Sequence, residues 1–113
     1  FSRDFTYVDN VAFFNRLVIE SEMESNFNVF NVAFGSRISI IEMAKLIKQK
    51  LSLKNSNIKN IDILHGEERA GDVPHSLASI KKAKRLINYQ PKVDFEQGLT
   101  KTIEWFYKNP LDT

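Results

Sequence analysis

Two arginine-containing clusters hold the side chains of this sequence that are best suited to recognition chemistry. Arg3 lies close to the start of the chain, and Arg69 lies in a charged stretch that continues to Asp72. A guanidinium offers a planar fork of N–H donors that matches a phosphate bidentately, and charge-assisted hydrogen bonds of this kind contribute roughly 1.5–3 kcal/mol each. If the two forks converge, they would hold a diphosphate.

The stretch around Arg69 carries two further residues that suit a nucleotide. Gly71 lets the chain turn tightly, and the carboxylate of Asp72 can accept a hydrogen bond from a ribose hydroxyl. The alternative is that both arginines form surface ion pairs, which contribute little energy. The partners would then be Asp4 or Asp9 for Arg3, and Glu67 or Glu68 for Arg69. Residue types alone leave both interpretations open.

No residue pattern in the sequence provides catalysis, cofactor binding or metal ligation. The four glycines are too scattered for a G-x-G-x-x-G turn, and no tyrosine is followed four residues later by a lysine. There is no cysteine, and His65 and His75 lack the spacing of paired metal ligands, so we expect both to be solvated loop histidines. The sequence therefore predicts no catalytic residue, no cofactor-binding residue and no metal ligand within the chain.

Three short strands and one long loop are expected to position the arginines. Alternating or β-branched apolar residues predict strands over residues 1–7, 29–34 and 61–64. Residues 66–78 are too rich in charged and turn-forming residues to be packed, and loops of this length inside a compact domain are often functional. Arg3 therefore belongs to the first strand and Arg69 to the loop.

Apolar residues at helical spacing predict four helices, which begin after Asp9, Ser39, Ser79 and Asp94, the first three acting as N-caps. Ser39 and Glu42 form a capping box, and Asn88 tolerates the left-handed conformation that ends the third helix. The fourth helix is expected to bury Phe106, and Gly98 inside it indicates close packing against a neighbour. The fold class is α/β or mixed α+β.

Length and composition indicate one soluble domain over residues 1–113. Of the 113 residues, 42% are hydrophobic and 27% are charged, which are ordinary proportions for a globular protein. The longest apolar runs are far too short to span a bilayer, so we expect no membrane segment and no leader peptide. The absence of cysteine favours a reducing setting, and the predicted location is the cytoplasm.

The charge of the chain is unevenly distributed. Residues 1–44 carry three basic and six acidic side chains, whereas residues 45–113 carry thirteen and eight, for a net charge of +2. Lysine-rich stretches at 45–59 and 81–85 could bind nucleic acid. They occupy positions that the apolar stripes of the predicted helices leave free, so we expect them to solvate helix faces and expect no nucleic-acid partner.

Five segments, in order along the chain, carry a family resemblance. They lie at residues 3–11, 30–35, 69–76, 82–91 and 98–105, and the third reads Arg-Ala-Gly-Asp-Val-Pro-His-Ser. At these segments the chain resembles the C-terminal part of the extended short-chain dehydrogenase/reductases (SDRs), the NAD-dependent epimerase/dehydratase family. Within that family it is most similar to the UDP-N-acetylglucosamine and UDP-glucose 4-epimerases. The Rossmann part would be absent, which accounts for the missing glycine-rich turn and Tyr-x-x-x-Lys pair.

The resemblance implies an activity and a set of contacts. In the family, NAD takes a hydride from C4 of the sugar and returns it to the other face, and the N-terminal part holds the NAD. Carried over by motif, Arg3 and Arg69 clasp the diphosphate of a UDP-sugar, and Asp72 binds the ribose. Ser76 lines the sugar pocket, where a small residue leaves room for an N-acetyl group, or else it only caps the turn into the third helix. Arg37 lies near the nucleotide.

The sequence departs from the family pattern at Asn10, Ser79 and Asn88, where the family often has Asp, Asp and Gly; none of these is a proposed UDP contact. Nucleotide-sugar 4,6-dehydratases and UDP-glucuronate decarboxylases share parts of the plan, and a self-standing basic binding module is the non-enzymatic alternative. The expected protein is a cytoplasmic UDP-sugar 4-epimerase, an isomerase of polysaccharide precursor supply, that forms a homodimer mainly through the absent part. This chain alone is expected to be inactive.

Overall fold

The structure, a computed structural model, describes residues 1–112. Its elements, in chain order, are strand β1 (Ser2–Arg3), helix α1 (Val8–Glu20), strand β2 (Ile38–Ser39), helix α2 (Ile40–Ser52), the 3₁₀ helix η1 (Ser56–Asn60), helix α3 (Lys81–Ile87) and helix α4 (Phe95–Lys108). The two strands pair antiparallel, with Ser2 opposite Ser39 and Arg3 opposite Ile38. Four helices with a small sheet confirm the predicted mixed α/β class.

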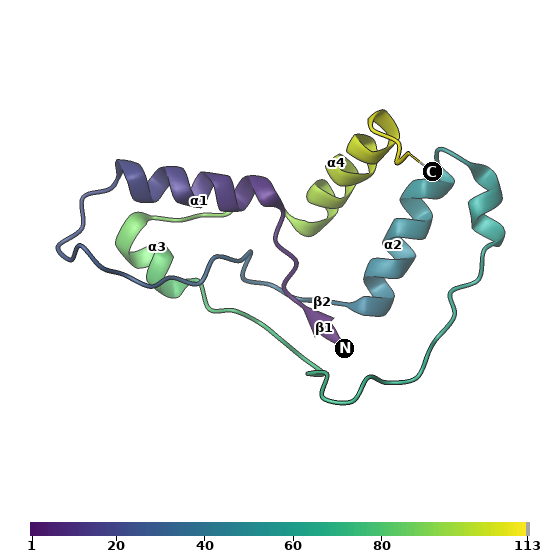
Figure 1. The fold of residues 1–113 in the computed structure, drawn as a ribbon, viewed down its shortest axis with the longest axis horizontal. Helices are drawn as coiled ribbons and strands as arrows, with labels where there is room; N and C mark the ends of the chain where they lie inside the picture. The colour runs from purple at the N-terminus through teal and green to yellow at the C-terminus, as the bar shows by residue number, and fades with distance from the viewer. Residues whose placement is uncertain (113) are drawn as a thin grey trace.

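The helices form two groups on either side of the sheet. Figure 1 shows α1 beside α3 on one side, and α2 with η1 and α4 on the other. The chain extends over 55 × 36 × 24 Å, and its radius of gyration is 17.4 Å, against about 13 Å for a compact domain of roughly 100 residues. The architecture is therefore open. No described helix is both long and apolar enough to cross a membrane.

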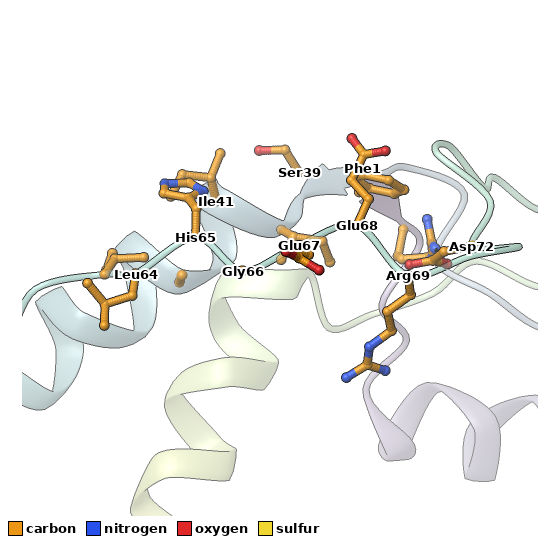
Figure 2. Close-up of a pocket in the computed structure, with 14 residues that line it drawn as sticks. Phe1, Ser39, Ile41, Leu64, His65, Gly66, Glu67, Glu68, Arg69 and Asp72 are labelled. Carbon is orange, nitrogen blue, oxygen red and sulfur yellow. Dashed lines mark hydrogen bonds and ion pairs between the residues drawn. The ribbon is translucent and has the colours of Figure 1, made fainter.

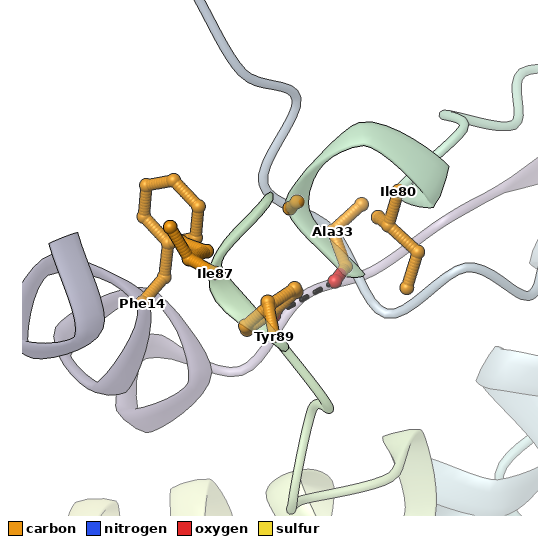
Figure 3. Packing of buried hydrophobic residues seen from close by; sticks show 6 residues of the cluster. Phe14, Ala33, Ile80, Ile87 and Tyr89 are labelled. Atoms are coloured by element: carbon orange, nitrogen blue, oxygen red, sulfur yellow. Dashed lines mark hydrogen bonds between the residues drawn. The ribbon is translucent and has the colours of Figure 1, made fainter. Parts of the chain in front are cut away.

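The hydrophobic core lies between α1 and α3 and is small. It contains six buried side chains, namely Phe14, Ala33, Ile80, Ala83, Ile87 and Tyr89 (Figure 3). The ring of Tyr89 is fully buried and meets Phe14 edge to face, with 5.4 Å between centroids. Its hydroxyl donates to the carbonyl of Ala33 at 2.9 Å, so the polar end of the ring is satisfied. Burial, followed by the nearby charge of Asp4, raises the pKa of the Tyr89 phenol.

Asn10 is the buried polar residue that connects α1 to the segment before α4. Its amide donates to the carbonyl of Val93 at 2.7 Å, and its oxygen accepts from the backbone N–H groups of Lys92 and Val93 at 3.0 Å each. An ionised aspartate has no donor for that carbonyl. Asparagine at this position therefore satisfies three backbone groups, two of which an aspartate could also satisfy.

The local signals for helix ends are confirmed where they are strongest. Ser39 and Glu42 form the predicted capping box at the start of α2, and Asp94 forms a second one with Gln97 at the start of α4. Asn88 ends α3 in the left-handed region, at φ 52° and ψ 38°. A Cβ at Gly98 would lie 2.8 Å from Cβ of Tyr7, which confirms the predicted close packing.

Two of the predicted helix starts were wrong by one or two residues. Helix α1 begins at Val8, so Tyr7 is its N-cap and Asp9 lies within the first turn. Helix α3 begins at Lys81 with Ile80 as N-cap, and the Ser79 hydroxyl accepts from the N–H of Lys81 at 3.5 Å. The predicted burial of Phe106 was also wrong, because that side chain is 49% exposed.

The predicted strands are mostly absent from the described residues. Only Ser2–Arg3 of the first is a strand, and residues 29–34 and 61–64 belong to no sheet. The apolar alternation at 29–34 still has a structural consequence, because Phe30 and Val32 pack against the core and Ala33 is buried within it. A strand also needs a neighbouring backbone with which to form a ladder, and within residues 1–112 no strand pairs with this segment.

Candidate functional site

A cavity of about 610 Å³ opens beside β1, between the start of α2 and residues 63–72. Its size lies within the range of ligand-binding clefts, roughly 300–1,000 Å³. Arg3 lines it from β1. Arg69 and Asp72 line it from the loop at residues 66–78, as Figure 2 shows. Arg3 therefore shares one cavity with two other predicted contact residues, Arg69 and Asp72, which lie more than sixty positions further along the chain.

The guanidinium of Arg3 is held by the loop that lies opposite it. Its Nη2 donates to Oδ1 of Asp72 at 2.7 Å, and its Nη1 donates to the backbone carbonyl of Ser2 at 2.8 Å. The pair is partly accessible, with the side chains of Arg3 and Asp72 being 27% and 41% exposed. A phosphate that binds here must therefore share the fork of Arg3 with Asp72 or displace its carboxylate.

The alternative to phosphate binding was that Arg3 and Arg69 form ion pairs with acidic residues close to them in the sequence. No such pair forms among residues 1–112. Asp4 instead accepts from the N–H groups of Phe34 and Gly35, at 3.1 and 2.8 Å, and so fixes the turn that precedes β2. Asp9 lies 3.7 Å from the amine of Lys101. Arg69 has no ion pair within the described chain, and Figure 2 shows its side chain pointing away from that of Glu68.

Ser76 and Arg37 lie outside the cavity lining. The N–H of Ser76 donates to the carbonyl of Ser2 at 3.1 Å, so Ser76 lies along β1 next to the loop residues that face the cavity. Arg37 precedes β2 and lines a separate cavity, which it shares with Glu42 and Lys45. The structure thus brings Arg3, Arg69 and Asp72 together, places Ser76 beside them and separates Arg37 from them.

The remaining wall of the cavity was not predicted from the sequence. It combines apolar side chains from the residue before β1, from α2 and from the segment after η1 with polar and loop residues, namely Phe1, Ser39, Ile40, Ile41, Ala44, Ile63, Leu64, His65, Gly66, Glu67 and Glu68. His65 is exposed, as expected of a loop histidine, but it faces the cavity. The apolar residues among them carry no sequence signal for a site, because their apolar character is equally typical of a helix core.

His75 has a specific partner, in contrast to the solvated side chain that the sequence predicts. Its Nδ1 lies 2.8 Å from the hydroxyl of Ser2, a buried residue of β1, although His75 itself is exposed. Residue 75 also forms a parallel bridge with Ser2. The loop therefore lies along the edge of β1 that β2 leaves free.

Comparison with known proteins identifies the family. A sequence model described as GDP-mannose 4,6 dehydratase matches residues 1–102. The chain belongs to this family. It is therefore a member of the NAD-dependent epimerase/dehydratases of the extended SDR type, as the resemblance implied.

Characterised relatives share both sequence and fold with this family member. UDP-glucuronate 4-epimerase of Thermodesulfobacterium geofontis is 30% identical over 96% of this chain. UDP-glucose 4-epimerase of Thermotoga maritima, solved with UDP-glucose, is 31% identical with a TM-score of 0.81, over 96% of this chain and 32% of that one. UDP-N-acetylglucosamine 4-epimerase of Methanobrevibacter ruminantium, solved with UDP-N-acetylmuramic acid, is 36% identical with a TM-score of 0.76, over the same shares.

The chain spans about a third of the length of the relatives it matches, 31% in the case of the Thermodesulfobacterium enzyme.

NAD is used in the family, because Bordetella bronchiseptica WbmF was solved with NAD⁺ and UDP. WbmF is 26% identical to this chain, with a TM-score of 0.74 over 96% of this chain and 30% of that one. Neither Gly35 nor the start of α2 offers a cradle for that cofactor. A Cβ at Gly35 would lie 2.9 Å from the side chain of Ile80, and the first turn of α2 is capped by its own Ser39 and Glu42. We assign NAD no residue in this chain.

Proposed function

We propose that this chain is the UDP-binding part of a NAD-dependent nucleotide-sugar 4-epimerase. The interconversion would be between UDP-N-acetylglucosamine and UDP-N-acetylgalactosamine, or between UDP-glucose and UDP-galactose. The observation that carries the proposal is the presence of Arg3, Arg69 and Asp72 in the lining of one cavity. The similarity to UDP-sugar 4-epimerases over 96% of the chain supports it.

Each of these side chains has a definite role in the proposed site. Arg3 and Arg69 would bind the two phosphates, and Asp72 would accept a hydrogen bond from the ribose. Ser76, beside the cavity, would form part of the sugar pocket. Arg37 lines a different cavity from Arg3, Arg69 and Asp72. Its contact with the nucleotide therefore stays a prediction from the resemblance alone. The chemistry at C4 would use NAD and catalytic residues that lie outside this chain.

Binding of the nucleotide at this site would assist a reaction that takes place elsewhere on the substrate. In a 4-epimerase the sugar must turn over between hydride removal and hydride return, while the nucleotide stays in place. Interactions with a distant, unreacting group supply binding energy that can be used at the reacting centre. The two guanidiniums would supply this anchor without taking part in the hydride transfer.

The proposal is tested on the natural protein that contains this chain. UDP and GDP binding are measured by calorimetry, and conversion of the four UDP-sugars is followed in the presence of NAD. We expect UDP binding, 4-epimer products, and a loss of roughly 2 kcal/mol or more of UDP affinity in Arg69→Ala. Arg16→Ala is the matched control, because Arg16 pairs with Glu20 on the exposed face of α1 and lines no described cavity. Unchanged UDP affinity in Arg69→Ala would contradict the proposed clamp.

A dehydratase or decarboxylase of the same family is the second candidate. It is favoured by the family model, whose description is GDP-mannose 4,6 dehydratase. A 4-keto-6-deoxy sugar as the product, or preferential binding of GDP, would identify a dehydratase, and release of carbon dioxide would identify a decarboxylase. Supply of polysaccharide precursors and a homodimer remain predictions that come from the resemblance, and cytoplasmic location remains a prediction from the absence of cysteine.

The non-enzymatic alternative, a basic binding module, has weaker support. Within the lysine-rich stretch, Lys50 lies 3.2 Å from Glu96, and the amine of Lys54 lies 4.9 Å from the ring centroid of Tyr107. These contacts are typical of lysines that cover a helix surface. Binding of RNA or DNA by the natural protein, together with no affinity for any nucleotide sugar, would favour the module over the enzyme.

A further inference from the structure

The loop at residues 66–78 has few attachments to the rest of the chain. Residues 66–77 are exposed, and none of them packs into the core. Within residues 1–112, every hydrogen bond that leaves this loop ends on Ser2 or Arg3. The positions of Arg69 and Asp72 at the cavity therefore depend on the contact between the loop and β1.

Ser2 is the centre of that contact. Its N–H donates to the carbonyl of Pro74 at 2.8 Å, and its carbonyl accepts from the N–H of Ser76 at 3.1 Å. Its hydroxyl lies 2.8 Å from Nδ1 of His75, the residue between those two. Three hydrogen bonds on one residue that is 6% exposed thus hold residues 74–76 along β1, where residues 2 and 75 form an isolated parallel bridge.

We propose that His75 is a positioning residue of the nucleotide site, an inference that rests on the function proposed above. Its bond to Ser2 holds the loop so that Asp72 stays beside Arg3 and Ser76 stays beside the cavity. A loop that is ordered before the ligand arrives loses less conformational entropy on binding. His75 does not line the cavity, so it acts on the nucleotide only through the loop.

The contribution of the His75 side chain comes from Nδ1. The Ser2 hydroxyl can donate to an unprotonated Nδ1 or accept from a protonated one, so the bond is available to both forms of the imidazole. Asparagine places an amide group close to the position of Nδ1, whereas alanine has neither donor nor acceptor. In His75→Ala the buried Ser2 hydroxyl loses its partner while the two backbone bonds remain, and an unsatisfied buried group is costly.

The test uses the natural protein that contains this chain. It measures the Kd for UDP by calorimetry and, without ligand, the rate of trypsin cleavage after Arg69. We expect His75→Ala to weaken UDP binding about three- to thirtyfold and to accelerate cleavage. His75→Asn is expected to restore both values to near those of the wild type. Ser2→Ala is expected to match His75→Ala, and the double variant is expected to be no worse than either single one, because both side chains act through one bond.

Several outcomes would overturn the inference. The inference is wrong if His75→Ala changes neither the Kd for UDP nor the rate of cleavage after Arg69. It is also wrong if His75→Asn impairs both quantities as much as His75→Ala does. If His75→Ala fails to fold, Ser2→Ala decides the question. If the wild type binds no UDP, the proposed function fails, while the cleavage assay still shows whether the bond orders the loop. Lys84→Ala on α3, an exposed residue outside the cavity, is the matched control and is expected to behave as the wild type.

Discussion

The core between α1 and α3 and the cavity wall at residues 66–78 are stabilised in opposite ways. The core consists of buried apolar side chains around the fully buried ring of Tyr89. The cavity wall is exposed, and it is attached to β1 by hydrogen bonds and by one ion pair. Burial fixes the first region whatever ligand is present, whereas the second can exchange its internal partners for those of a ligand.

Because of this difference, substitutions in the two regions are expected to affect different quantities. Changes in the core are expected to alter the free energy of unfolding, and changes in the cavity wall are expected to alter ligand affinity at nearly constant stability. Surface residues away from packed regions usually change stability by less than about 0.5 kcal/mol. The predictions below test this separation in the natural protein, from the largest expected effect to the smallest.

Phe14→Ala is expected to destabilise the protein by about 3–5 kcal/mol, because it removes a ring that packs against Tyr89 and Phe30 and leaves a cavity. Urea unfolding followed by circular dichroism measures the loss. Ile19→Ala on the same helix is the control, because Ile19 is 84% exposed. Similar losses in both variants would show that the α1–α3 cluster is not the stabilising core.

Arg69→Lys is expected to lower UDP affinity by roughly 1.5–3 kcal/mol at unchanged stability. The charge is kept, but an ammonium is a point charge without the two-pronged geometry of a guanidinium. Calorimetry with UDP, paired with the melting temperature, measures both quantities. Retained affinity would reduce the role of Arg69 to general charge attraction, and a lower melting temperature would contradict the separation of the two regions.

Gly98→Ala is expected to destabilise the protein by about 1–3 kcal/mol through overpacking. The added methyl would lie 2.8 and 2.9 Å from Cβ and Cγ of Tyr7, and the backbone of both elements would have to shift. Gly66→Ala in the loop is the matched control, because nothing lies within 4 Å of its added Cβ. Chemical denaturation of the two variants side by side measures the difference, and equal stabilities would refute the close contact.

Ser76→Tyr is expected to lower kcat/KM for UDP-N-acetylglucosamine by about tenfold and to spare UDP-glucose. A bulky side chain leaves no room for the acetamido group, and a well-packed wall absorbs added volume only at a strain of roughly 1–3 kcal/mol. Steady-state kinetics on both sugars measures the effect. Equal losses on both would indicate general damage to the loop, and no loss on either would place Ser76 outside the sugar pocket.

Ser39→Ala is expected to cost about 1 kcal/mol of stability, since it removes the N-cap of α2. The hydrogen bond from the Ser39 side chain, followed by the one from its backbone, lowers the pKa of Glu42 from 4.5. The stabilisation from Glu42 is therefore present above pH 4.5 and is lost as the pH falls through the folded-state pKa. Urea unfolding at several acidic pH values is expected to show a shallower pH dependence in Ser39→Ala, and identical slopes would contradict this linkage.

The sequence by itself determined the features that depend on near neighbours. The capping box of Ser39 and Glu42 and the left-handed Asn88 were both predicted, because each depends mainly on local backbone geometry. The long loop at residues 66–78 was predicted for the same reason, since its charged and turn-forming residues cannot be packed. A glycine inside a helix also predicted the close packing of Gly98, although not its partner Tyr7. The family was also evident from short motifs that keep their order and spacing.

Only the tertiary structure decided which distant residues meet. Residues 29–34 have the alternation of a strand but pair with no strand of the described chain, and a sequence pattern does not specify the partner that a ladder requires. Arg3 had charged neighbours in its own segment, yet its guanidinium binds Asp72, and Ser2 binds His75. These contacts link positions about seventy residues apart, so they depend on how the loop returns to β1 rather than on local preference.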